Sequence, residues 1–145
     1  MSIDGLSDDD VRAILKRAKT FAVVGASANP ERPSNGVMRF LIDQGYIVKP
    51  VNPGIAGKTI QGQLVYENLA AVPAPIDVVD LFRASAEVPE IVRDAIAVKK
   101  STGASVIWTQ LGVINEEGAA IARAAGFTVV MDRCPKIEFA RLMRS

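Results

Sequence analysis

The segment Gly25-Ala26-Ser27-Ala28-Asn29-Pro30 follows a short apolar stretch and precedes residues with helical spacing. A glycine at such a junction allows a tight turn, and the free N–H groups that begin the next helix attract phosphate. Ser27 can add a hydroxyl to this contact, although the hydroxyl can also bond within its own turn. Arg32 can pair with phosphate or stay solvated. The segment is therefore either a phosphate-binding loop or a plain strand-to-helix connection.

The loop departs from the dinucleotide fingerprint G-x-G-x-x-G, because Ser27 and Pro30 take the second and third glycine positions. NAD sites also expect an acidic residue about 20 positions further on, yet residues 48–53 contain no carboxylate. With Lys49 there instead, a ligand with an additional phosphate is favoured, and coenzyme A and NADP both qualify. Lys49 and Lys58 can meet the 3′-phosphate of coenzyme A, or they can simply be exposed.

Two polar residues follow later apolar stretches. Arg83 comes directly after residues 76–82, and its guanidinium can hold a phosphate through two parallel hydrogen bonds. The alternative is an ion pair with Asp80 or a neighbouring acid. Gln110 follows residues 104–109 and can either bond the amides of a pantetheine arm or cap its own loop. Trp108 is expected to pack in a sheet rather than stack on adenine.

Cys134 is the single cysteine, so no disulfide can form within the chain, which fits a reducing, cytoplasmic setting. It lies beside Arg133 and Lys136 at an expected helix start, and both features lower the pKa of a thiol. Cys134 can therefore form a mixed disulfide with the thiol of coenzyme A. The alternative is a small, idle, buried cysteine.

The composition excludes several classes of function. The chain has no histidine, which removes Ser-His-Asp and Cys-His catalysis, histidine metal sites and phosphohistidine chemistry. Asp77, Asp80 and Asp132 alternate between strand faces without a second thiol, so we expect no metal site. The net charge of +1 argues against nucleic-acid binding. No apolar run reaches the length of a membrane span, and the start at Met1 lacks the pattern of a secretory signal.

The elements that must position these residues alternate along all 145 residues, and 49% of the residues are hydrophobic. Helical spacing predicts an N-terminal helix at about 7–18 that Ser7 caps. The other expected helices begin near Pro33, Ser85, Asn115 and Pro135, with a short one around 66–71 in the irregular region 55–75. Short apolar runs predict five strands, at 20–25, 46–51, 76–82, 104–109 and 128–132.

This alternation predicts an α/β chain of the Rossmann-like, doubly wound kind, with five mainly parallel strands and helices on both faces of the sheet. We expect the strand order 3-2-1-4-5 and one domain over residues 1–145. In such sheets a ligand lies beyond the carboxyl ends of the strands, at the switch between strands 1 and 4. The loops after residues 25, 52, 82 and 109 are therefore the candidate site.

Six segments in matching order resemble the small CoA-binding protein family, which is similar to the N-terminal CoA-binding domain of the succinyl-CoA synthetase α subunit. The resemblance runs from about Phe21 to the C-terminus, over residues 25–27, 32–34, 50–53, 77–83, 108–113 and 130–134. It implies contacts to the nucleotide phosphates, the adenosine and the rest of the cofactor. Together with the residues discussed above, the expected binding set is Gly25, Ala26, Ser27, Arg32, Ser34, Asn52, Pro53, Lys58, Phe82, Arg83, Gln110 and Gly112.

The ligase reaction of the synthetase does not carry over, because the second domain and its phosphorylated histidine have no match here. We therefore expect non-catalytic binding of coenzyme A or an acyl-CoA through the loops after strands 1, 2, 3 and 4. The alternatives are an NADP-dependent oxidoreductase and a detached subunit of an acyl-CoA ligase. We expect no nucleic-acid or membrane partner, and a homodimer is possible.

Overall fold

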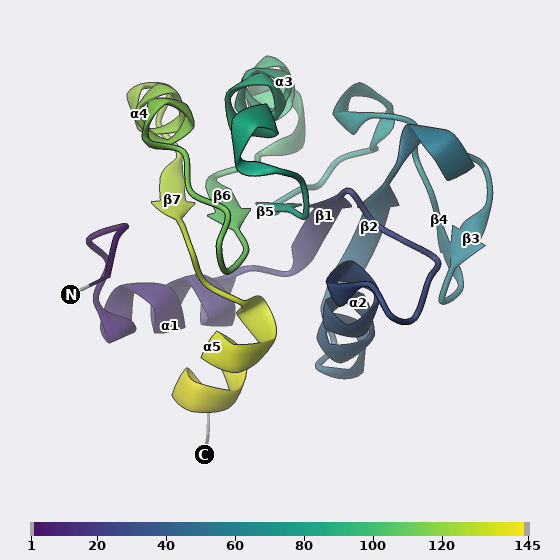
Figure 1. Cartoon of the computed structure of the whole chain (residues 1–145), viewed down its shortest axis with the longest axis horizontal. Coiled ribbons are helices and arrows are strands. Elements are labelled where there is room, and N and C mark those ends of the chain that lie inside the picture. Colours follow the sequence, from purple (N-terminus) through teal and green to yellow (C-terminus); the bar gives the residue numbers. More distant parts are fainter. Residues whose placement is uncertain (1, 144–145) are drawn as a thin grey trace.

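The central feature of the fold is a sheet of five parallel strands in the order β2-β1-β5-β6-β7 (Figure 1). The structure is a computed structural model that describes residues 2–143, so Met1, Arg144 and Ser145 of the expected domain range lie outside the described residues. The strands are short, as their apolar runs predict: β1 (Thr20–Val24), β2 (Ile47–Val51), β5 (Val78–Leu81), β6 (Val106–Thr109) and β7 (Thr128–Val130).

Helices cover both faces of the sheet, because successive strand residues point to opposite sides and both sides are apolar. Ala22, Val79 and Ile107 belong to the core under α3 (Val88–Thr102) and α4 (Glu116–Ala124). Phe21, Val78 and Trp108 belong to the opposite core, under α1 (Asp8–Arg17), α2 (Pro33–Asp43) and α5 (Pro135–Leu142) (Figure 1). The predicted α/β class, with parallel strands and helices on both faces, is confirmed.

Local signals set most helix starts. The Ser7 hydroxyl accepts a hydrogen bond from the Asp10 N–H, and Asp10 accepts one from the Ser7 N–H in return. The side chain of Asn115 accepts from Gly118 N at the start of α4. Ser85 is not the cap of α3, because a 3-10 turn over residues 85–87 precedes that helix. The Ser85 hydroxyl instead accepts a hydrogen bond from Ile114 N.

The sheet keeps the doubly wound arrangement. Residues 76–82, however, do not form the strand beyond β2, which is where the expected order 3-2-1-4-5 puts the third strand of the chain. They form β5, which pairs directly with β1. The position beyond β2 is held by one parallel bridge between Val51 and Tyr66, so 76–82 takes the fourth position. Next to this bridge a small hairpin joins β3 (Thr59–Ile60) and β4 (Gln63–Leu64), and the short helix expected at 66–71 is a 3-10 turn over Leu69–Ala71. A single bridge leaves no strand pattern in the sequence. The sequence therefore predicts that the next apolar run, residues 76–82, lies beyond β2.

Long-range polar contacts fix the N-terminal segment against the sheet. The guanidinium of Arg133 donates from Nε to Asp4 Oδ2 at 2.8 Å and from Nη1 to Glu138 Oε1 at 3.2 Å, and Asp4, Arg133 and Glu138 are all buried. Trp108 is fully buried and donates from its indole nitrogen to the Arg133 carbonyl at 2.9 Å, which confirms its packing role. Within residues 2–143, none of the helices has the length and apolar character needed to cross a bilayer.

Candidate ligand-binding site

A pocket of about 730 Å³ opens at the carboxyl edge of the sheet, where the connections from β1 and β5 leave in opposite directions. Ligands in doubly wound sheets bind at such switch points, and this volume is typical of small-molecule sites. The lining comes from the loops after β1, β2, β5 and β6, from the first turns of α2 and from the residue before α5. It consists of Gly25, Ala26, Ser27, Arg32, Pro33, Ser34, Val37, Asn52, Phe82, Arg83, Ala84, Gln110, Leu111, Val113 and Cys134.

Most residues expected in the site lie around this one pocket, but three do not line it. Pro53 lines a smaller neighbouring pocket, Lys58 is exposed, and the Gly112 N–H is bonded to Asp132 Oδ1 at 2.7 Å. Sequence reasoning missed the apolar residues Val37 and Val113. Val37 looks like any core residue of an amphipathic helix, so only the position of α2 beside the loop reveals it.

Gly25 lets two of these loops meet. Its φ of +88° is a conformation that side chains rarely adopt, and a Cβ built on it would lie 2.5 Å from the carbonyl oxygen of Phe82. The same atom would lie 2.8 Å from Cδ of Arg83. The contact exists because β5 neighbours β1. The sequence predicted a tight turn at Gly25, and the structure adds the close approach of the β5 loop.

Hydrogen bonds within the loop after β1 hold it in shape. Ser27 N donates to the Ser34 hydroxyl at 3.1 Å, so that N–H is already used inside the protein. The Ser27 hydroxyl oxygen accepts from Asn29 N at 3.1 Å, and its own hydrogen stays available to a ligand. Asn35 donates from its side chain to the Ser27 carbonyl at 3.0 Å. The loop is thus pre-organised, and Ser27 lines the pocket.

Asn52 replaces the acidic residue of NAD sites and ties two loops together. Its side-chain nitrogen donates to the Ala26 carbonyl at 2.8 Å, and its side-chain oxygen accepts from Gly54 N at 2.9 Å. Lys49 lies away from the pocket, because its ammonium donates to the carbonyls of Pro73 and Pro75 at 2.9 and 3.0 Å. The hypothesis that Lys49 meets a phosphate is therefore not supported by its position.

Arg83 lines the pocket and is held by an acid of the next turn. Its Nη2 donates to Glu87 Oε1 at 2.6 Å, so the partner is Glu87 and not Asp80. Because the Arg83 guanidinium bonds to it, the pKa of the Glu87 carboxyl is lowered from its usual value. Both side chains are about 40% exposed, and an exposed pair of this kind contributes little stability. Arg83 can therefore turn to an anion at small cost.

Asp80 and Gln110 form a buried polar pair beneath the pocket. Gln110 Nε2 lies 2.6 Å from Asp80 Oδ1 in donor position, and Asp80 is completely buried. The other carboxyl oxygen, Oδ2, has no hydrogen-bond partner among the described residues. Burial raises the pKa of Asp80 well above its usual value, and the Gln110 contact opposes this rise only in part. Sequence reasoning considered Asp80 only as a partner of Arg83 or a metal ligand.

Cys134 is partly buried and lines the end of the pocket next to α5. Arg133 does not serve as its activating cation, because the Arg133 guanidinium is occupied by Asp4 and Glu138. Among residues 2–143 no cluster of three or more His, Cys, Asp and Glu side chains is arranged to hold a metal ion.

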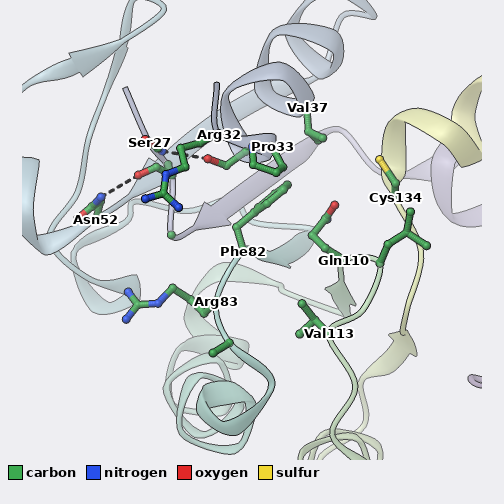
Figure 2. Close-up of a pocket in the computed structure, with 15 residues that line it drawn as sticks. Ser27, Arg32, Pro33, Val37, Asn52, Phe82, Arg83, Gln110, Val113 and Cys134 are labelled. Carbon is green, nitrogen blue, oxygen red and sulfur yellow. Dashed lines mark hydrogen bonds between the residues drawn. The ribbon is translucent and has the colours of Figure 1, made fainter. Parts of the chain in front are cut away.

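The pocket has a cationic end and an apolar end. Arg32, Arg83, Ser27 and Asn52 gather on one side, as Figure 2 shows, and no carboxylate is among the lining residues. Val37, Val113 and Cys134 lie on the other side, with Phe82 and Gln110 between the two groups (Figure 2). Such a pocket suits a long ligand with anionic groups at one end and a weakly polar arm at the other.

Residues 19–140 match the family model described as a CoA binding domain. The chain is 37% identical to the uncharacterized protein YneT of Bacillus subtilis (strain 168), over 92% of this chain and 95% of YneT. It is 41% identical to a hypothetical protein from Pyrococcus horikoshii OT3, with a TM-score of 0.91, covering 99% of this chain and 97% of the other.

A more distant likeness concerns a larger protein and shows the fold alone. The dinucleotide-forming acetyl-coenzyme A synthetase 1 of Ca. Korarchaeum cryptofilum is 24% identical with a TM-score of 0.63. The match covers 77% of this chain but only 25% of the synthetase. The match to the family model covers all five strands of the sheet and all four loops of the pocket, and so this chain belongs to the CoA-binding domain family.

Proposed function

We propose that the pocket at the switch point binds coenzyme A or an acyl-CoA without transforming it. The observation that carries this proposal is the polarity of the pocket: two arginines and a pre-organised loop at one end, and an apolar channel at the other. Coenzyme A has the same distribution, with phosphates at one end and a pantetheine arm at the other. Membership of the CoA-binding domain family supports the same ligand.

The polarity also sets the orientation of the ligand. Its phosphates lie toward Ser27, Arg32 and Arg83, where charge-assisted hydrogen bonds are available. Its arm passes Phe82 and Gln110, and the thiol or thioester ends near Cys134. In this orientation Cys134 is the protein group nearest the ligand's sulfur, which supports a mixed disulfide with coenzyme A. Pro53, in the neighbouring pocket that shares Gly25 and Arg83, borders the adenosine.

The two alternatives have less support. An oxidoreductase using NADP would bind its ligand at the same switch point, but membership of the CoA-binding domain family favours coenzyme A over NADP. The likeness to the larger synthetase is one of fold, so a role as a ligase subunit rests on analogy alone. The sequence analysis leaves a homodimer open, and light scattering measures the oligomeric state directly.

Titration calorimetry with coenzyme A, acetyl-CoA, NADP and NAD tests the proposal. We expect both coenzyme A compounds to bind far more tightly than NADP or NAD. Arg83→Ala should weaken coenzyme A binding by roughly 10–100-fold, because a hydrogen bond to a charged group contributes about 1.5–3 kcal/mol. The matched control is Arg93→Ala, an equal change of charge at an exposed position of α3. Equal affinity for NADP and coenzyme A, or equal effects of the two variants, would contradict the proposal.

A further inference from the structure

Asp80 lies at the centre of the sheet, on the face that α1, α2 and α5 cover. Its register neighbours are Val23 on β1 and Trp108 on β6, both fully buried. Within residues 2–143 its carboxyl has one hydrogen-bond partner, the carboxamide of Gln110, and Gln110 in turn lines the pocket. An ionised carboxylate in this position would leave one charged oxygen without a partner, which is very unfavourable in an apolar surrounding. An uncharged carboxyl group therefore fits this position better than a carboxylate.

A neutral acid changes the direction of the Gln110 contact. If the Gln110 amide hydrogens point to Asp80, the acidic hydrogen on Oδ2 has no acceptor. If the amide is turned so that its oxygen faces Asp80, the acid donates to that oxygen, and only a carbonyl-type oxygen is left unbonded. A buried carbonyl oxygen without a partner is somewhat more common in proteins than a buried donor without one. The contact of 2.6 Å is also ordinary for O–H···O and short for N–H···O.

We propose that Asp80 is a positioning residue that donates a hydrogen bond to the Gln110 carboxamide and thereby turns the Gln110 NH₂ group into the pocket, where it binds a carbonyl oxygen of the ligand. The inference rests on the proposed function, since it gives Gln110 one role along the arm of coenzyme A. That carbonyl belongs either to the pantetheine amides or to the thioester of an acyl-CoA.

Charged groups around this face do not offer another explanation. The helices that cover it carry exposed or half-exposed ionisable side chains, apart from Glu138, which is buried and bonded to Arg133 and Arg141. The ionisable side chains of these three helices are Asp8, Asp9, Asp10, Arg12, Lys16, Arg17, Arg39, Asp43, Lys136, Glu138 and Arg141. None of them, nor Tyr46 or Cys134 on the same face, is among the causes that shift the pKa of Asp80.

Binding measurements on two variants test the inference. Asp80→Asn keeps a donor for the Gln110 oxygen without a titration, so it should bind coenzyme A within about twofold of the natural chain near pH 6. Asp80→Leu removes the donor and should weaken coenzyme A binding by up to about tenfold, the effect of one neutral hydrogen bond. Adenosine 3′,5′-bisphosphate has no carbonyl and should bind all three proteins equally.

The pH profile separates positioning from mere packing. Affinity of the natural chain should fall, relative to Asp80→Asn at each pH, as the pH rises through the raised pKa of Asp80. Comparison at equal pH cancels the titration of the ligand's own phosphates. If the affinity falls for acetyl-CoA alone, the contact is to the thioester. If the affinity falls equally for acetyl-CoA and coenzyme A, the contact is to a pantetheine amide. Parallel profiles for the two proteins, or a weaker adenosine bisphosphate complex in Asp80→Leu, would overturn the inference.

A ligand-free measurement distinguishes this inference from the proposed function. The ¹³C signal of the Asp80 carboxyl, assigned by its loss in Asp80→Asn, should report a protonated acid at pH 7. An ionised Asp80 at that pH overturns the inference even if coenzyme A binds. If the natural chain binds no coenzyme A, the proposed function fails, and with it the role of Gln110, whatever the state of Asp80.

Discussion

Replacing Gly25 by alanine tests whether the close approach of the β1 and β5 loops builds the site. The new Cβ would lie 2.5 Å from the Phe82 carbonyl oxygen, which is backbone and cannot turn aside as a flexible side chain would. Alanine also has to adopt a φ of +88°. The left-handed conformation costs about 1–2 kcal/mol for a residue with a Cβ, and forcing an atom into packed surroundings costs about 1–3 kcal/mol more. We expect Gly25→Ala to lower the free energy of unfolding by about 2–5 kcal/mol in total.

Gly57→Ala is the matched control, because it separates the two costs. Gly57 has a φ of +87°, and a Cβ built on it would have no atom within 4 Å. Gly57→Ala should therefore lower the free energy of unfolding only by the cost of the left-handed conformation, about 1–2 kcal/mol. The difference between the variants, about 1–3 kcal/mol, measures the contact with the β5 loop.

Urea unfolding and calorimetry provide the two readouts. With a slope of about 2 kcal/mol per molar urea, Gly25→Ala should unfold at a concentration roughly 0.5–1.5 M below Gly57→Ala. Coenzyme A affinity should fall in Gly25→Ala, because the Phe82 and Arg83 loop has to move away from the phosphate loop, and should be unchanged in Gly57→Ala. Equal midpoints and equal affinities would refute the view that the two loops are held in contact at Gly25.

Three further predictions concern ionisable residues and the cysteine. Burial raises the pKa of Asp80 in the folded chain above its unfolded value of about 4, so the contribution of Asp80 to folding is full below about pH 4. As the pH rises from there to the raised pKa, this contribution should fall by about 1.4 kcal/mol per pH unit. Asp80→Asn should abolish this slope in urea unfolding at several pH values, and an unchanged slope would contradict the raised pKa. Burial raises the pKa of Asp4, but hydrogen bonds from Arg133 and from the Leu6 and Met131 N–H groups outweigh burial and lower this pKa to about 2. The stabilisation by Asp4 is therefore present above about pH 4 and is lost as the pH falls toward 2. Asp4→Asn should lower the free energy of unfolding by roughly 3 kcal/mol at pH 7, and stability should then vary less with pH on the acid side. A variant as stable as the natural chain at pH 7 would argue against the buried pair of Asp4 and Arg133. Incubation with coenzyme A disulfide should attach one coenzyme A to Cys134, because the Cys134 thiolate attacks one sulfur of the disulfide and a coenzyme A thiolate leaves. Mass spectrometry measures the rate at which this adduct forms, and excess adenosine 3′,5′-bisphosphate should slow it. An unchanged rate would mean that the disulfide reacts with Cys134 from outside the pocket.

The sequence predicted best those features of the fold that depend on residues close together in the chain. Helix starts at Ser7, Asn115 and Pro135 follow from caps and turn chemistry within three or four residues. The five apolar runs became five strands, because strands buried on both faces carry continuous apolar residues. The four loops of the site followed from this alternation, since parallel strands bring their carboxyl ends to one edge.

The sequence could not show which strands pair or which partner a charged side chain takes. Tyr66 contributes one bridge to the sheet, so no pattern marks the third position, and 76–82 was placed there instead of beside β1. Lys49 donates to carbonyls 24 and 26 residues away, and Arg133 pairs with Asp4 across 129 positions. Contacts over such separations depend on the finished topology, and a single sequence without its fold carries no direct sign of them.

The corrected strand order changes what the site can do. With β5 next to β1, the loop after β5 lies beside the phosphate loop, and Arg83 lines the same end of the pocket as Ser27 and Arg32. The same pairing buries Asp80 between β1 and β6, two residues before Phe82, where Gln110 is the one side chain among the described residues that hydrogen-bonds to its carboxyl group. In the predicted order Asp80 would belong to an edge strand, where a carboxylate is easily hydrated and ionised. The central position makes it a neutral donor, and so one pairing choice determines both the charged end of the pocket and the polarity of its middle.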